Sequence, residues 1–235
     1  MRTFAVVCLL CLSLAVCSSV SLAHGYAMDE SLRNPASLVD LGDTSLLYGW
    51  YGTDASVLIG YAEYDEIAKG HGALFVRRDN ALGTTYSYLA ARDFGRASLG
   101  MSIHKNTGGS DDWYSDIGVR VNLGLLELGG MVMGMNPSGL NTSITWITAS
   151  AGSPASFRLG VDAAVTGTPE YRAHLHYSGI RNITLGTVVE LDADLSVLSS
   201  EHRLMISLSS TTVSISHTLE SGLDPVFRIG FGVRY

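Results

Sequence analysis

The side chains with the most chemical potential gather between positions 158 and 176. His174 and His176 are two residues apart in a run of alternating polar and apolar residues. In a β-strand such a pair shares one face, with the two residues about 7 Å apart, a spacing that can bind a metal ion. The sequence offers no identifiable third ligand. We therefore predict a hydrogen-bonded polar surface, which also contains Arg158 and Arg172, and neither a metal site nor a cofactor.

Nucleophilic catalysis is the second chemistry that the residue types permit. His104, His176 or His217 could activate one of the many serines, if a carboxylate or amide oriented the imidazole. The Gly-x-Ser-x-Gly pattern is absent, and nothing in the sequence distinguishes one serine as a nucleophile. We predict that the protein is not an enzyme.

The run from Leu125 to Met135 is apolar on both of its faces. Methionine adapts to irregular surfaces, so Met131 and Met133 could line a path for a hydrophobic solute. They could equally pack against the short N-terminal segment, if that segment lies inside a barrel, and we favour this packing role. Together with Arg158, Arg172, His174 and His176, they form the candidate substrate path.

Apolar residues occupy every second position through most of the chain, a period typical of β-strands with one apolar and one polar face. The clearest runs are 97–103, 117–123, 157–165, 171–177, 183–191, 213–215 and 227–235. Turn-forming residues separate them, as at 136–139 and 222–225. We predict an all-β protein of about 14 strands, within a range of 12–14, and no helical pattern among them.

The first 23 residues have the features of a secretory signal peptide. Arg2 supplies a positive charge, 4–16 is an apolar run, and Ala23 ends a stretch of small residues suited to cleavage. The apolar run is too short to span a membrane as a helix. We predict a signal peptide at 1–23, an N-terminal segment with a short helix or turn at 24–43, and a single β-domain at 44–235.

Composition excludes several functional classes. The formal net charge is −7, and no basic stripe is visible, which argues against a nucleic-acid partner. All three cysteines (Cys8, Cys11 and Cys17) lie within the predicted signal peptide. The remaining chain therefore has neither disulfides nor zinc–thiolate sites.

Two architectures suit many alternating antiparallel strands: a soluble β-sandwich and a closed membrane barrel. A sandwich faces its charged residues outward, whereas a membrane barrel faces its apolar residues to lipid and its polar residues to the lumen. The polar positions here carry mainly Gly, Ser, Thr, Asn, His and Arg, with only two lysines in the chain. Aromatic residues near strand ends would suit the two membrane interfaces. These are Tyr48, Trp50, Tyr86, Tyr88, Trp113, Tyr114, Trp146, Tyr171, Tyr177 and Tyr235.

The C-terminus favours the barrel. Arg228, Gly230, Val233 and the last residue, Tyr235, occupy the four positions of a pattern that resembles the terminal strand of bacterial outer-membrane barrels. The resemblance implies an assembly signal read by the barrel-assembly machinery. A terminal strand with a free edge can pair with that machinery before the barrel closes.

A second resemblance lies near the N-terminus. Asn34, Pro35 and Ala36, followed by Leu38 and a first strand containing Tyr48 and Trp50, resemble the start of FadL-type barrels. This family includes long-chain fatty-acid transporters and PorV-like, secretion-associated barrels. The resemblance implies fourteen strands, but this chain is shorter than the family's transporters, so segment 24–43 can form only a small plug.

We therefore predict a single antiparallel transmembrane β-barrel in the bacterial outer membrane, in contact with outer-membrane lipid. The first predicted function is passive transport of hydrophobic or small solutes, with a hydrophobic small molecule as ligand. A non-transporting, structural or partner-binding barrel of the PorV-like kind is the first alternative. A soluble secreted β-sandwich is the second.

Overall fold

The computed structural model describes residues 24–79, 83–108, 113–136, 144–153, 156–180 and 182–235. Helix α2 (His24–Arg33) and the 3₁₀ helix η1 (Pro35–Leu41) come first. Fourteen strands follow: β1 (Leu46–Gly52), β2 (Val57–Asp65), β3 (Gly70–Asp79), β4 (Gly83–Asp93), β5 (Ala97–Asn106), β6 (Trp113–Asn122), β7 (Leu126–Met135), β8 (Ile144–Ser153), β9 (Phe157–Ala164), β10 (Tyr171–Ile180), β11 (Ile183–Leu191), β12 (Val197–Leu208), β13 (Thr211–Glu220) and β14 (Val226–Arg234).

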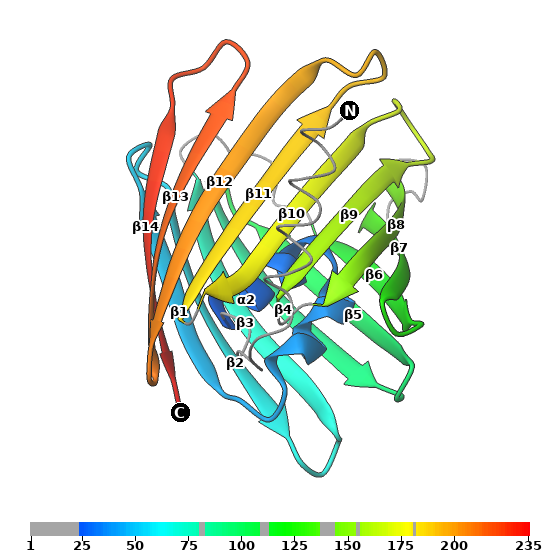
Figure 1. Ribbon diagram of the computed structural model, residues 1–235, viewed down its shortest axis with the longest axis vertical. Helices are drawn as coiled ribbons and strands as arrows, with labels where there is room; N and C mark the ends of the chain where they lie inside the picture. The colour runs from blue at the N-terminus through cyan, green and yellow to red at the C-terminus, as the bar shows by residue number, and fades with distance from the viewer. Residues whose placement is uncertain (1–23, 80–82, 109–112, 137–143, 154–155, 181) are drawn as a thin grey trace.

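The strands form one closed antiparallel barrel (Figure 1). Each strand pairs with its neighbours in sequence, and β14 closes the ring on β1 with Trp50 opposite Gly230. The predicted barrel of 14 strands is thus confirmed. The sandwich alternative is wrong, because the strand order returns to its start and leaves no free sheet edge.

Alternation along the strands gives the barrel an apolar outside. Val161 is 57% exposed and Ile229 65% exposed, although both are aliphatic residues in the body of a strand. Soluble domains rarely expose large continuous apolar surfaces, whereas a barrel in lipid requires one. Within the described residues, no helix is both long enough and apolar enough to cross a membrane.

The prediction that aromatic residues lie at the membrane interfaces needs a correction. Tyr86, Tyr88, Trp113, Tyr171 and Tyr235 are exposed on the outside. Tyr48, Trp50 and Trp146, by contrast, face the lumen: Tyr48 and Trp146 are buried there, and Trp50 packs against the buried core. Strand parity decides this outcome, since Tyr48 and Trp50 both lie on the inward parity of β1.

The two ends of the barrel differ in the length of their connections. At the end where β1 begins and β14 finishes, two to four residues join successive strands; we call this the short-turn end. At the opposite, long-loop end, three to eight residues join them. Outer-membrane barrels have the same asymmetry, with short periplasmic turns and longer extracellular loops.

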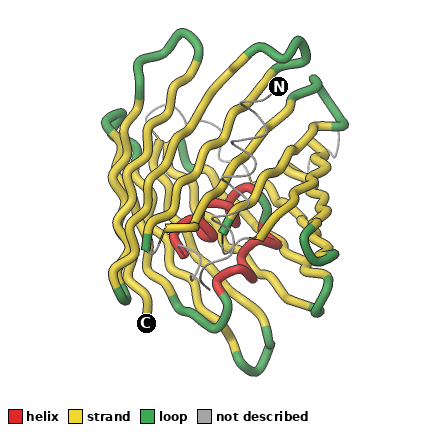
Figure 2. The backbone as a smooth tube through the Cα atoms, viewed as in Figure 1, coloured by secondary structure: helices red, strands yellow, loops and turns green. Residues whose placement is uncertain are grey.

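The N-terminal helices lie inside the barrel (Figures 1 and 2). We call α2 and η1 together the inner segment. Met28, Leu38 and Leu41 are fully or almost fully buried in a cluster that includes the inward-facing Leu58 and Phe75. This apolar packing against β1–β4 holds one side of the inner segment to the wall.

Candidate functional site: the lumen and its inner segment

The Asn-Pro-Ala triplet lies against the wall of the barrel with little space between them. Asn34 caps η1, with its Oδ1 accepting a hydrogen bond from the Ala36 amide at 3.0 Å, and Pro35 takes the first helical position. The triplet lies over two glycines that are paired across β5 and β6, Gly100 and Gly118.

These two glycines form a cradle for the triplet. A Cβ at Gly100 would overlap the backbone of Pro35 and Ala36, and one at Gly118 would overlap the Asn34 side chain. Only a residue without a side chain allows so close an approach. The sequence singled out the triplet as a family motif but not the glycines that receive it, since nothing local marks them.

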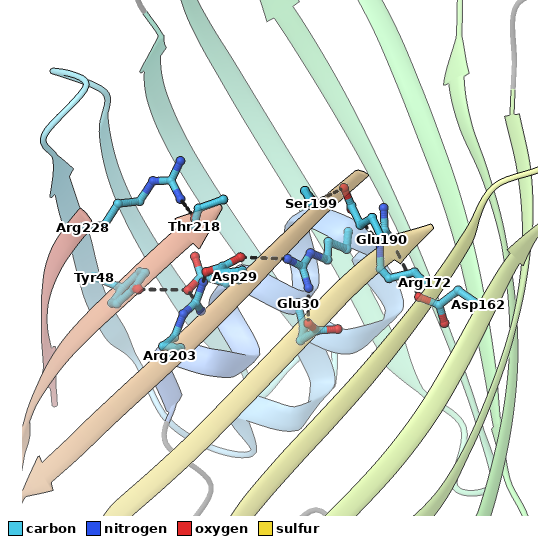
Figure 3. A network of polar contacts seen from close by, with 12 residues as sticks. Asp29, Glu30, Tyr48, Asp162, Arg172, Glu190, Ser199, Arg203, Thr218 and Arg228 are labelled. Carbon is cyan, nitrogen blue, oxygen red and sulfur yellow. Dashed lines mark hydrogen bonds and ion pairs between the residues drawn. The ribbon is translucent and has the colours of Figure 1, made fainter. Parts of the chain in front are cut away.

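Ion pairs hold the opposite side of the inner segment (Figure 3). Arg203 on β12 binds both Asp29 of α2 and Glu201 of its own strand. Arg33 of α2 lies 3.1 Å from Glu30 and 3.1 Å from Glu201. Tyr48 donates a further hydrogen bond to Asp29 at 2.9 Å. Charge-assisted bonds of this kind are stronger than neutral ones.

A second group of ion pairs lies nearer the short-turn end of the lumen, around η1. Arg120 binds Asp40 of η1 through both of its terminal nitrogens, at 2.9 and 3.1 Å, and also binds Glu127 of β7. Glu127 binds Arg158 as well.

The surroundings of Glu30 favour its charged form. Burial by itself raises the pKa of this carboxyl, but the positive charge of Arg33 lowers it. Further basic side chains on β9 and β10 act in the same direction as Arg33, and the pKa of Glu30 falls below its ordinary value of 4.5. Glu30 therefore stays ionised in the lumen down to a lower pH than a solvent-exposed glutamate.

The residues predicted to line a substrate path lie around one side of the inner segment. A small pocket of about 40 Å³ separates them from it, lined by Met131, Arg158, Arg172 and His174 on the wall and by Asn34 and Ser37 on the segment. His176 is only 1% exposed. Met133 packs against the cluster of Met131, Trp146 and Ala164. The methionines thus pack within the wall of the lumen and beside the inner segment.

A larger cavity of about 600 Å³ lies above α2, toward the long-loop end. Asp29, Leu32 and Arg33 of α2 contribute to its lining. Its other charged residues are Arg77, Glu170, Glu190, Glu201, Arg203, Glu220 and Arg228, and its apolar residues are Trp50, Leu58, Val188 and Leu198. The sequence did not predict this set as the lining of one cavity, and it assigned Arg228 only to the C-terminal pattern. Charged residues on the inward strand parity were the available signal.

A buried polar cluster contains His104, one of the histidines considered for catalysis. Its two ring nitrogens lie 2.7 Å from Ser87 Oγ and 3.0 Å from an Asp116 oxygen. The order of groups resembles a hydrolase triad. All three residues are buried, however, and none lines the described cavities. In the described part of the chain, no group of three or more His, Cys, Asp or Glu side chains is arranged to hold a metal ion.

The four residues of the C-terminal pattern point to both sides of the wall. Gly230 is buried on the lumen side, whereas Tyr235, just beyond the end of β14, is 73% exposed. Arg228 faces the lumen, where its guanidinium lies 4.9 Å from the centre of the Trp50 ring. Val233 pairs with Leu47 of β1, at the closure of the barrel.

Comparison with solved structures supports the fold. The outer membrane protein Omp33 of Acinetobacter baumannii superimposes with a TM-score of 0.64 at 8% identity, over 82% of this chain and 98% of that one. A mutant of the Rh. blastica porin gives 0.51 at 10% identity, with the same two shares of the chains covered. The KdgM porin, solved in complex with disordered oligogalacturonate, gives 0.50 at 8% identity, over 82% of this chain and 99% of that one.

These likenesses establish a porin-like barrel fold. No protein-family model matches the sequence, and no curated protein matches it. The resemblance to FadL-type barrels receives no support from these comparisons and stays a prediction.

Proposed function

We propose that the protein is a passive channel for small polar solutes, entered through the cavity at the long-loop end and restricted by the inner segment. The observation that carries the proposal is the cavity of about 600 Å³ with α2 in its lining. Charged and hydroxyl side chains make up most of that lining. Of the hydrophobic or small solutes predicted from the sequence, it therefore suits small polar ones better. The channel needs no catalytic group, in keeping with the prediction that the protein is not an enzyme.

The proposed location is the bacterial outer membrane. The apolar outer face, the unequal ends and the likeness to outer-membrane barrels support it. The long-loop end would then face the outside of the cell. Export by a signal peptide is part of the same proposal. The predicted signal peptide, residues 1–23, lies outside the described residues. Lipid and the barrel-assembly machinery, which would read Arg228, Gly230, Val233 and Tyr235, complete the proposed partners.

In this proposal, solutes pass when the inner segment moves away from the wall. The predicted path residues around the 40 Å³ pocket, Met131, Arg158, Arg172 and His174, would then line the opened passage. His176 lies on the same inward face of β10 as Arg172 and His174, and Met133 lies beside Met131. The basic side chains among them suit a small polar solute better than a long acyl chain, because an acyl chain would leave these charges unpaired.

A second candidate function is a non-transporting barrel with a fixed plug. The glycine cradle and the ion pairs of Arg120 and Arg203 favour it, since all of them bind the inner segment to the wall. The two candidates differ in one testable respect: whether the inner segment must move for the protein to act.

A disulfide between the inner segment and the wall separates these candidates. A Cβ at Gly118 would lie 3.0 Å from Cγ of Asn34, so cysteines at both positions would bring two sulfur atoms within bonding reach. We would measure the conductance of the full chain in planar bilayers, in a background where Cys8, Cys11 and Cys17 are replaced by serine.

The channel proposal predicts that oxidised Asn34→Cys/Gly118→Cys protein conducts at least about tenfold less than the same protein after reduction. Each single variant is the control for the lost cap or the filled cradle, and neither should respond to reductant. Conductance of the cysteine-free parent that equals the oxidised double variant would instead support the fixed plug.

A further inference from the structure

The arginines that line the large cavity are not equivalent. Arg203 and Arg33 each contact two carboxylates of the chain itself, and Arg77 contacts Asp79 at 3.4 Å. The charges of Arg203 and Arg33 are therefore used to hold the inner segment. Arg228, the fourth arginine of the lining, has a different set of contacts.

Arg228 forms no ion pair with a carboxylate of the described residues, although its charge acts at longer range on the carboxyls of Asp54 and Glu201. Its Nη1 donates to Thr218 Oγ1 at 2.7 Å, and its guanidinium lies over the Trp50 ring, 4.9 Å from the centroid. Its Nε has no hydrogen-bond partner in the part of the chain that the structure describes. A guanidinium has five N–H donors in a fork that matches a carboxylate, and only one of them has a hydrogen-bond partner among the described residues. In Figure 3 the residue stands apart from the ion pairs of Asp29 and Arg203.

We infer that Arg228 is the anion-binding group of the cavity and takes the carboxylate of a small solute that carries a single negative charge. Trp50 fixes the guanidinium from one side, and Thr218 fixes it from another. The residue thus presents a pre-oriented cation to the cavity, with its stacking face already occupied.

The rest of the lining limits which carboxylates fit. Glu170 and Glu220 also line the cavity, and neither side chain has a partner among the described residues. Thr218 and Glu220 lie on the same inward parity of β13, which brings a carboxylate about 7 Å along the strand from the group that anchors Arg228. A second negative charge on the solute would be repelled there, whereas a neutral or cationic group would be accepted.

This inference rests on the proposed function, since it names the solute class of the same cavity. The test measures binding separately from passage. Trp50 is one of three tryptophans, so a Trp113→Phe/Trp146→Phe background leaves it as the only tryptophan reporter beside Arg228. Propionate, β-alanine, succinate and propylamine are the probes, because they differ mainly in charge. The heat-dependent shift in electrophoretic mobility confirms that each variant is folded.

We expect saturable changes in Trp50 fluorescence with propionate and β-alanine, and clearly weaker binding of succinate and propylamine. Arg228→Gln should raise the half-saturating concentration about tenfold or more, as expected for a lost charge-assisted hydrogen bond. Arg228→Lys keeps the charge but loses the fork of N–H donors. Its affinity should therefore lie between that of the protein with Arg228 and that of Arg228→Gln. Arg234→Gln is the matched control: it removes the same charge from the same strand, but at the short-turn end and outside the cavity lining.

Equal effects of Arg228→Gln and Arg234→Gln would overturn the inference, and so would binding of propylamine as tight as that of propionate. Passage of the probes into liposomes is measured on the same samples. Arg228-dependent binding without any passage leaves the site standing and contradicts the proposed channel. Passage without Arg228-dependent binding contradicts the site alone.

Discussion

Two glycines determine where the inner segment can lie. Gly100 and Gly118 let the backbone of Pro35 and the side chain of Asn34 approach the wall more closely than any Cβ would allow. The contact joins residues that are more than sixty positions apart in the sequence. A glycine of this kind matters because it leaves room for the inner segment, and only the folded barrel brings that segment next to it.

Gly100→Ala should displace the inner segment. The new methyl group would overlap backbone atoms, which cannot rotate away, so we expect a loss of about 1–3 kcal/mol in the free energy of unfolding. Unfolding of the detergent-solubilised barrel in urea measures the loss. Gly72→Ala is the control, because its methyl group would meet only the Tyr88 hydroxyl, at 3.7 Å. Equal stability of the two variants would contradict the cradle.

Glu30 should make the seating of the inner segment sensitive to acid. Its pKa is lower in the folded protein than the ordinary value of 4.5. Its contribution to stability is therefore complete above that value and is lost as the pH falls through the lowered pKa. Below pH 4.5 the difference in unfolding free energy between the wild type and Glu30→Gln should shrink. A difference that stays constant with pH would show that the charge of Glu30 does not hold the segment.

At the scale of the strand, parity decides which residues meet lipid. Leu175 lies on the outer face of β10, while its neighbours His174 and His176 face the lumen. The same rule places Trp50 inside the barrel, against its predicted interfacial location. The period of a strand reveals that it has two faces. It does not tell whether a given aromatic residue lies on the face toward the lumen or on the face toward lipid.

Depth in the membrane gives a sharper test of parity than a comparison of faces. Leu175→Arg, near the middle of β10, should cost about 2–4 kcal/mol, and Leu208→Arg, exposed at the end of β12, about 0–1 kcal/mol. Refolding into lipid vesicles at increasing urea concentrations measures both. Equal costs would contradict a transmembrane orientation of the strands.

The inner segment shows the limit of element-level reasoning. The sequence indicated a short helix or turn, and the structure has α2 and η1 in this region, with Asn34 as a cap. No local rule predicts that Arg203 and Arg120 will bind Asp29 and Asp40 from distant strands. These ion pairs exist only because closure of the barrel brings β6 and β12 around the same helices.

At the scale of the whole molecule, closure satisfies the backbone hydrogen bonds internally. The β1–β14 pairing removes the last free edges, so the barrel should resist cold detergent and unfold only on heating. We expect the detergent-extracted protein to migrate differently before and after boiling. Recovery from the aqueous fraction, with a single mobility, would contradict a lipid-embedded barrel.

The sequence alone determined the class of the fold. Period-two alternation from Ala97 to Tyr235, few lysines and a terminal strand ending on an aromatic residue were enough to predict about 14 strands facing lipid, because each signal is local to a strand. The arginines and histidines of β9 and β10 could be assigned to the lumen for the same reason.

Tertiary structure decided everything that depends on which strands meet across the lumen. It filled the space beside the predicted path residues with the inner segment, and it left a cavity of about 600 Å³ on the other side of α2. It also turned Arg228, a residue of the C-terminal pattern, into a cavity-lining cation that forms no ion pair among the described residues. Charges on separate strands acquire their partners only when the barrel closes, and sequence spacing carries no record of that geometry.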